Sequence, residues 1–229
     1  HNILKACIKN KVPNFFLASS SEVYQTADEI PTSEEIECKV PDVLNPRYSY
    51  GGGKIASELL TINYLRSTDI RFVIFRPHNV YGPQMGFEHV IPELIGKIHK
   101  SVQDLEHNGE EYEIEIQGSG NDTRSFIYID DAVKAIELCT IDCNDRGIYH
   151  IGNIDENRII QLIRLLEKLL QVNLKIKSID KPEGSTSRRC PDNRKIRSLG
   201  YEQEFSLQEG LKKTIKWYWN EYKERKYND

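Results

Sequence analysis

The sequence predicts an α/β fold in which a doubly wound parallel sheet is followed by a smaller C-terminal α/β domain. Short apolar segments of strand length alternate with segments of helical periodicity along the 229 residues, and this alternation is typical of parallel strands joined by crossover helices. A polar run at 19–22 directly follows one of these strands, at the position where open α/β sheets bind ligands. The hydrophobic content of 38% is sufficient for a substantial core.

The first third of the chain alternates helix and strand. Residues 1–11 resemble the end of an amphipathic helix, because their apolar side chains recur on one helical face. Residues 15–18 form a short buried strand, and 25–47, which contains three prolines, is expected to be a loop. A helix at 48–66 and a strand at 71–76 (RFVIFR) complete this part.

The rest of the chain continues the alternation after a loop at 77–87. The helix expected at 130–140 begins with acidic residues, as the helix dipole favours. The other expected elements are strands at 112–116, 125–129, 147–151 and 174–179, and helices at 89–100, 158–171 and 207–223.

Charge and composition argue against several functional classes. The formal net charge is -4 with both signs spread along the chain, which gives no electrostatic footprint for nucleic acid or an anionic membrane. No apolar run approaches the roughly eighteen residues of a membrane span. The five cysteines lack a C-x-x-C spacing and the six histidines lack ligand spacing, so neither a disulfide framework nor a metal site is predicted. We therefore expect a cytoplasmic protein with reduced thiols.

Tyr50 and Lys54 are the strongest candidates for chemistry. If 50–54 is helical, the i,i+4 spacing places the phenol and the ammonium on one face within reach of each other. A cation stabilises the charged form of a neighbouring phenol, which can then act as a base near neutral pH. This arrangement suits the oxidation of a sugar hydroxyl. Three consecutive glycines at 51–53 indicate either close approach of a cofactor or partner, or an irregular helical turn.

Four further segments accompany this pair, and together they point to one family. They are 19–24 (SSSEVY), 76–83 (RPHNVYGP), 118–131 (GSGNDTRSFIYIDD) and 188–195 (RRCPDNRK). With 50–54 (YGGGK), they resemble the motifs of the extended short-chain dehydrogenase/reductase family, the NAD-dependent nucleotide-sugar epimerases, dehydratases and decarboxylases. Gln25 stands where the family has a glycine, and Asn193 and Arg194 replace its usual residues. The resemblance runs through nearly the whole chain and implies a Rossmann-like sheet.

The resemblance implies roles for the catalytic residues. Tyr50 would take the hydroxyl proton as a phenolate, and Lys54 would support it and bond the nicotinamide ribose. Ser20 falls where the family holds the 4-hydroxyl of the sugar. Ser21 and Glu22 also belong to this catalytic set, and in dehydratases a glutamate at the position of Glu22 removes the proton beside the transient ketone.

The resemblance also implies binding residues. Ser19 and Pro77 would join Tyr50 and Lys54 in holding NAD. Contacts to the nucleotide sugar are implied for Asn79, for Val90 at a helix start, for Arg124 as a bidentate diphosphate ligand, and for Arg188 or Arg189 as a second clamp.

One family feature is missing from the front of the chain. No G-x-x-G-x-x-G or G-x-G-x-x-G turn lies between a strand and a helix, and this turn normally binds the pyrophosphate of the dinucleotide. We therefore expect residues 1–84 to be the C-terminal part of an NAD-binding domain in a longer protein, and the chain alone to be inactive. Residues 85–229 would form the substrate domain, with 125–155 returning to the Rossmann sheet.

The sequence favours a nucleotide-sugar 4-epimerase, on the weight of the YGP, RSF and RRCPD segments. Ser21 and Glu22 favour the alternatives, a 4,6-dehydratase or a decarboxylase of the UDP-glucuronate type. A non-catalytic scaffold of the same fold is a further alternative, supported by the missing turn. We also expect a homodimer through the helices at 1–11 and 48–66, because the resemblance implies a four-helix bundle and 55–65 has more apolar positions than one stripe needs.

Overall fold

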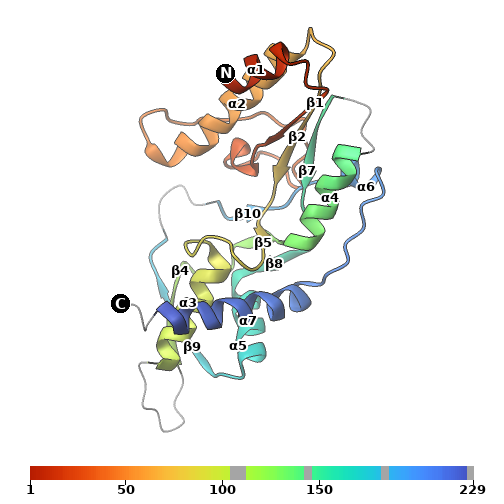
Figure 1. The fold of residues 1–229 in the computed structure, drawn as a ribbon. Helices are drawn as coiled ribbons and strands as arrows, with labels where there is room; N and C mark the ends of the chain where they lie inside the picture. The colour runs from red at the N-terminus through yellow and green to blue at the C-terminus, as the bar shows by residue number, and fades with distance from the viewer. Residues whose placement is uncertain (104–111, 142–145, 182–185, 226–229) are drawn as a thin grey trace.

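A three-stranded parallel sheet forms the first part of the molecule (Figure 1). The computed structural model describes residues 1–103, 112–141, 146–181 and 186–225. The strands are β1 (Asn14–Ala18), β2 (Arg71–Pro77) and β7 (Gly147–Ile151), in the order β1-β2-β7. Phe16 lies opposite Val73 and Phe75 lies opposite Tyr149, so β2 is the central strand. The predicted α/β fold with parallel sheets is confirmed.

Helices cover both faces of this sheet: α1 (Asn2–Lys9) and α2 (Ser49–Leu65) on one, α4 (Ile129–Ile141) and α6 (Arg194–Arg197) on the other (Figure 1). Successive side chains of β2 point to opposite faces of the sheet, so they pack alternately against the helices of one face and those of the other. Phe72 and Ile74 pack in the cluster of Leu4 and Leu65, whereas Val73 packs in the cluster of Ala135. The sheet is therefore doubly wound.

A second hydrophobic core lies below this sheet in Figure 1. It is formed by three helices and a pair of parallel strands: α3 (Val90–Gln103), α5 (Ile159–Leu170), α7 (Leu207–Arg225), β4 (Tyr112–Gln117) and β9 (Leu174–Ile179). Helical spacing places Ile91, Ile95 and Ile98 of α3 in this core, where they meet Leu162 of α5 and Leu211 of α7.

Short strands connect the two cores. β5 (Thr123–Ser125) pairs in parallel with β10 (Arg188–Arg189) and antiparallel with β8 (Glu156–Arg158). β3 (Val80–Tyr81) pairs with β6 (Ile127–Tyr128). The register places Arg189 directly opposite Arg124, so two arginines far apart in sequence become neighbours.

The prediction of one strand at 125–129 is wrong. Ser125 ends β5 opposite Glu156, Ile127 begins β6 opposite Val80, and Ile129 is already the first residue of α4. The chain changes partner strands at Phe126, whose side chain is buried in the second core. An apolar run alone does not reveal such a change of partner.

The loop expected at 25–47 is flanked by two short 3-10 helices, η1 (Ser21–Tyr24) and η2 (Pro46–Tyr48). Among the described residues, no helix is long and apolar enough to cross a membrane. β7 belongs to the three-stranded sheet, while the division of the chain into domains at residue 84 stays a prediction.

Candidate active site

Tyr50 and Lys54 lie in the first turns of α2, on the face that looks toward the carboxyl end of β1. The Nζ atom of Lys54 donates a hydrogen bond of 2.8 Å to the carbonyl oxygen of Ala18, the last residue of β1. The same Nζ atom lies 5.6 Å from the centroid of the Tyr50 ring. Tyr50 is 56% exposed, so part of this residue is accessible to a ligand.

Of the three glycines in this turn, Gly51 is the one that packing requires. A Cβ atom at Gly51 would lie 2.6 Å from the carbonyl oxygen of Glu22 and 2.4 Å from the side chain of Gln25. A Cβ atom at Gly53 would meet nothing within 4 Å. The sequence left two explanations for the glycines at 51–53, close approach of a cofactor or partner and an irregular helical turn. In the structure the segment is regular α-helix, and η1 is the segment that approaches it closely. The three glycines still cost about 1 kcal/mol each relative to alanine, and no side-chain hydrogen bond caps α2.

Gly51→Ala is expected to lower the free energy of unfolding by about 1–3 kcal/mol, because the backbone of η1 must move away from α2. Gly53→Ala is the matched control and should raise stability by about 1 kcal/mol, because its methyl group enters open space on a helix. Urea denaturation of both variants measures the difference. Equal effects of the two substitutions would contradict the close approach at Gly51.

The serine cluster 19–21 connects β1 to η1, and its three hydroxyl groups have different environments. The Ser20 hydroxyl accepts a 3.2 Å hydrogen bond from the amide of Glu22, which caps η1 and leaves the hydroxyl proton available to a ligand. Ser19 is buried and donates to the Glu58 carboxylate. Ser21 is 5% exposed. Of the three, Ser20 is therefore the one best placed to contact a substrate.

Glu22 forms an ion pair with Arg189 across 167 positions of sequence. The second contact of this pair, from Nη2 of Arg189 to Oε2 of Glu22, is 3.5 Å long. The side chain of Arg189 is 16% exposed and that of Glu22 is 39% exposed. A candidate catalytic residue and a candidate diphosphate ligand thus contact each other directly.

Arg124 lies beside Arg189 and is held by backbone oxygens. Its Nη1 donates to the carbonyl of Thr123 at 2.8 Å and its Nη2 to that of Thr186 at 2.7 Å. Burial and the nearby guanidinium of Arg189 lower the pKa of Arg124. An arginine in such a place is suited to bind an anion, because a phosphate would offset both the lost hydration and the repulsion between the two cations.

A cavity of about 280 Å³ opens beside Arg124 and is also lined by Asn79 and Val90. Asn79 has a left-handed backbone (φ 41°) and donates from its side chain to the carbonyl of Ser125 at 2.8 Å. Val90 is the first residue of α3, where helix amides lack partners within the helix. Three of the predicted substrate-binding residues therefore share one cavity.

Arg188 and Pro77 lie apart from this cavity. Arg188 points to the other side of β10 and forms an exposed ion pair with Glu156, with contacts of 2.8 and 2.6 Å. Pro77 is the last residue of β2 and lies opposite Ile151 in the sheet. Of the two arginines expected as a clamp, the structure brings Arg189 to Arg124 and not Arg188.

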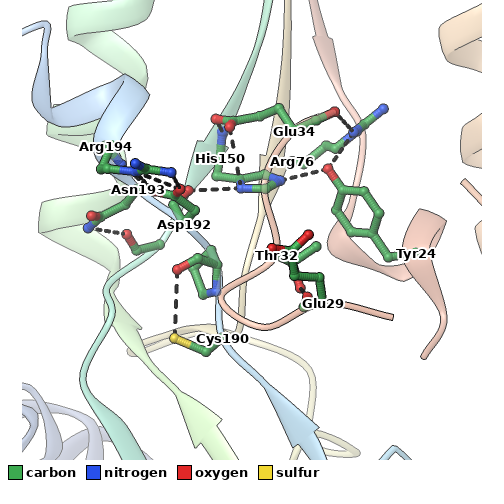
Figure 2. A network of polar contacts seen from close by, with 12 residues as sticks. Tyr24, Glu29, Thr32, Glu34, Arg76, His150, Cys190, Asp192, Asn193 and Arg194 are labelled. Carbon is green, nitrogen blue, oxygen red and sulfur yellow. Dashed lines mark hydrogen bonds and ion pairs between the residues drawn. The ribbon is translucent and has the colours of Figure 1, made fainter. Parts of the chain in front are cut away.

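A buried polar network next to the site was not predicted from the sequence. Arg76 and Glu58 form an ion pair whose side chains are 4% and 6% exposed. Arg76 also donates to the hydroxyl of Tyr24, which lies 2.7 Å from Nε2 of His150 (Figure 2). Burial raises the pKa of Tyr24 and lowers that of His150, so both groups are held neutral. A charged residue ending the apolar strand RFVIFR was the available signal for this network.

The site fits one end of NAD, the cofactor that the resemblance implies. The Lys54 ammonium has three donors, of which one is used on Ala18, so two can bond ribose hydroxyl groups. The exposed phenol of Tyr50 lies beside it at the carboxyl end of a parallel sheet, where dinucleotides bind. The chain offers no glycine-rich turn for the pyrophosphate, so these residues account for the nicotinamide end only.

Comparison with curated proteins gives relatives with nucleotide-sugar activities. The chain is 29% identical over 221 residues to a trifunctional UDP-glucose 4,6-dehydratase/UDP-4-keto-6-deoxy-D-glucose 3,5-epimerase/UDP-4-keto-L-rhamnose-reductase of Arabidopsis thaliana, covering 95% of this chain and 31% of that protein. It is 31% identical over 215 residues to UDP-glucuronic acid decarboxylase 1 of Xenopus tropicalis, covering 93% of this chain and 48% of that protein. The chain thus spans less than half of the length of either relative.

Among solved structures, the fold is similar to that of a UDP-glucose 4-epimerase from Thermotoga maritima in complex with UDP-glucose. The TM-score is 0.80 at 24% identity, covering 99% of this chain and 68% of that one. Residues 1–154 match the NAD dependent epimerase/dehydratase family, which is about two thirds of the chain. These residues include the Tyr50–Lys54 pair, the serine cluster and Arg124, and the chain therefore belongs to the NAD dependent epimerase/dehydratase family.

Proposed function

We propose that the protein is a nucleotide-sugar 4-epimerase that acts by transient oxidation at C4 of the sugar. One observation carries the proposal: a series of contacts connects the helix of Tyr50 and Lys54 to the cavity beside Arg124. Gly51 packs α2 against η1, Glu22 of η1 contacts Arg189, and Arg189 lies opposite Arg124. A diphosphate at Arg124 would direct the attached sugar toward Ser20 and Tyr50.

In this mechanism the Tyr50 phenolate takes the proton of the 4-hydroxyl group, and the Lys54 ammonium stabilises the phenolate. Ser20 donates its free hydroxyl proton to the same sugar oxygen and orients it. Bound NAD would supply the hydride acceptor, held at its nicotinamide end by Lys54, Tyr50, Ser19 and Pro77. Rotation of the sugar and return of the hydride to the opposite face of C4 would invert the configuration, and the phenol of Tyr50 would return the proton to the same oxygen.

In this proposal the cavity beside Arg124 binds the diphosphate of the substrate. The Arg124 guanidinium would bind the diphosphate by two parallel N–H donors, with Arg189 as its second cation. The amides at the start of α3 near Val90 and the side chain of Asn79 would complete the site. Uridine, thymidine and guanosine diphosphate sugars all carry the diphosphate that these groups recognise.

The ion pair of Glu22 with Arg189 favours a 4-epimerase over a dehydratase or a decarboxylase. Both carboxylate oxygens of Glu22 are occupied by contacts to the guanidinium of Arg189. Epimerisation at C4 needs no second base, whereas a 4,6-dehydratase needs a base for the C5 proton. Glu22 can keep its partner during epimerisation.

A dehydratase or a decarboxylase is the second candidate. Glu22 follows Ser20 and Ser21 directly, so a change of its ion pair would bring a carboxylate close to the sugar. The relatives named above include a 4,6-dehydratase and a UDP-glucuronic acid decarboxylase. A non-catalytic scaffold of the same fold is disfavoured by the joint presence of Ser20, Tyr50, Lys54 and Arg124.

The reactions are separated by assaying the protein as its gene encodes it with NAD and UDP-, dTDP- and GDP-sugars, beside its Glu22→Gln variant. We expect a 4-epimer product and near-normal turnover in the variant, because Glu22 moves no proton. Glu156→Gln is the matched control, since it neutralises the carboxylate that pairs with Arg188 outside the cavity.

Two other results would overturn the epimerase assignment. A large loss of turnover in Glu22→Gln with accumulation of reduced cofactor would indicate dehydration. Release of carbon dioxide from a uronic-acid nucleotide would indicate decarboxylation.

We also propose that the protein is a homodimer through α1 and α2. Apolar side chains are exposed on both helices: Ile3 is 70% exposed, Leu59 56% and Leu60 40%. Burying them against a second copy would remove this apolar surface from water. Sedimentation of the protein as a monomer at micromolar concentration would contradict the dimer. The cytoplasmic location stays a prediction.

A further inference from the structure

The strongest feature outside the proposed catalytic set is the buried ion pair between Glu58 of α2 and Arg76 of β2. Nε of Arg76 lies 2.9 Å from Oε1 of Glu58, and Nη2 lies 2.5 Å from Oε2, which makes the contact bidentate. Both side chains are almost completely buried. Their geometry fixes the distance and rotation of α2 relative to the sheet, because a planar fork accepts one orientation of a carboxylate.

This pair is connected to the segments that carry the candidate site. The hydroxyl of Ser19, one residue before Ser20, donates to Glu58. Nη1 of Arg76 donates to the hydroxyl of Tyr24 at the end of η1, and to the carbonyl of Glu34 at 3.1 Å (Figure 2). The end of β1, the short helix η1 and helix α2 therefore meet at this one ion pair.

The position of Glu58 on α2 relates it to the catalytic pair. Glu58 follows Lys54 by four residues and Tyr50 by eight, so the three side chains lie along one side of the helix. The Lys54 ammonium contacts the end of β1 and the Glu58 carboxylate contacts the end of β2. Two successive turns of α2 are thus fixed to two neighbouring strands.

The beginning of α2 depends on such contacts. Its first turn contains the three glycines and has no side-chain cap, so the local sequence favours fraying at the residues that include Tyr50. A base must be held close to its working geometry, because a displacement of about 1 Å can lower a rate by about a hundredfold.

We propose that Glu58 and Arg76 are positioning residues for Tyr50 and Lys54. They hold the glycine-rich first turn of α2 in its catalytic place through the bidentate contact and the bond from Ser19. An effect of Glu58 and Arg76 on the catalytic rate is expected only if the proposed function is correct. Their effect on the order of the first turn of α2 does not depend on that function.

The energetics of buried ion pairs support a positioning role over a purely stabilising one. Replacing a buried pair by apolar residues of similar volume is often neutral for stability, whereas removing one partner leaves an uncompensated charge and is strongly destabilising. A double apolar variant removes the geometric constraint without leaving a buried charge unpaired, which separates the two roles better than either single substitution.

The test compares Glu58→Leu/Arg76→Leu with the unchanged protein as its gene encodes it. We expect the double variant to keep a single cooperative thermal transition, at a lower midpoint because Ser19, Tyr24 and Glu34 lose a hydrogen-bond partner. Amide hydrogen exchange at 50–54 should be about tenfold faster than in the unchanged protein. The kcat for the nucleotide sugar should fall about a hundredfold with KM nearly unchanged, because the cavity beside Arg124 does not contain either residue. Glu58→Asp keeps the charge and shortens the side chain. Its exchange rate at 50–54 and its kcat should lie between those of the double variant and those of the unchanged protein.

Tyr201→Phe is the control. It removes a buried hydrogen bond of 2.6 Å to Asn153 on the α4 side of the sheet, and should leave exchange at 50–54 unchanged. Unchanged exchange at 50–54 in the double variant would overturn the positioning role, whatever the activity. Faster exchange in a protein that turns over no nucleotide sugar would leave the positioning role standing and reject the proposed function instead.

Discussion

A Tyr50→Phe variant is expected to lose about a thousandfold in turnover, because it keeps the ring and removes the group that would take the proton from the sugar. Binding of the nucleotide sugar should change little, since Tyr50 lies outside the cavity beside Arg124. The measurement is steady-state kinetics with the best substrate of the nucleotide-sugar panel, together with the affinity for the corresponding nucleoside diphosphate.

Tyr48→Phe is the matched control for this loss. Tyr48 lies two residues away in η2 and undergoes the same chemical change, but it lies outside the helix that carries Lys54. We expect its turnover to remain near that of the unchanged protein. Full activity in Tyr50→Phe would rule out a phenolate base at this position.

The second large effect is expected at Arg124, where replacement by alanine should weaken the binding of nucleoside diphosphates by about thirtyfold. This factor corresponds to about 2 kcal/mol, the range of a charge-assisted hydrogen bond. Isothermal titration calorimetry with UDP, dTDP and GDP measures it without any turnover. Arg124→Lys, which keeps the charge and loses the fork, should recover part of the affinity.

Arg188→Ala serves as the control for Arg124. The side chain of Arg188 is exposed and paired with Glu156, so its loss should leave nucleotide affinity within about twofold. An Arg124→Ala variant that binds these nucleotides as tightly as the unchanged protein would remove Arg124 from the substrate site.

The parts of the site that the sequence could predict depend on local spacing. Tyr50 and Lys54 are four residues apart on a helix, and their placement on one face follows from helix geometry alone. The parallel sheet could likewise be predicted from the alternation of strands and helices, because each element carries its own apolar periodicity.

Contacts between distant segments could not be predicted in the same way. The pair of Glu22 with Arg189 depends on the register of β10 against β5, which positions Arg189 beside Arg124. Nothing in the sequence around Glu58 distinguishes it from other charged residues of a helix. Only the packing of α2 on β2 makes it the partner of Arg76. Charge in a sequence indicates that a partner is needed without indicating which one.

The central position of β2 restricts insertions and deletions in this strand. The side chains of its even-numbered residues, Phe72, Ile74 and Arg76, face helices α1 and α2. Those of its odd-numbered residues, Val73 and Phe75, face helix α4. Gain or loss of one residue before Arg76 would exchange the two sets, since the side-chain period of a strand is two. The guanidinium would then face the alanines of α4 while Glu58 faced an apolar side chain. Length variation in related proteins is therefore expected in the loops on either side of β2, and not within it.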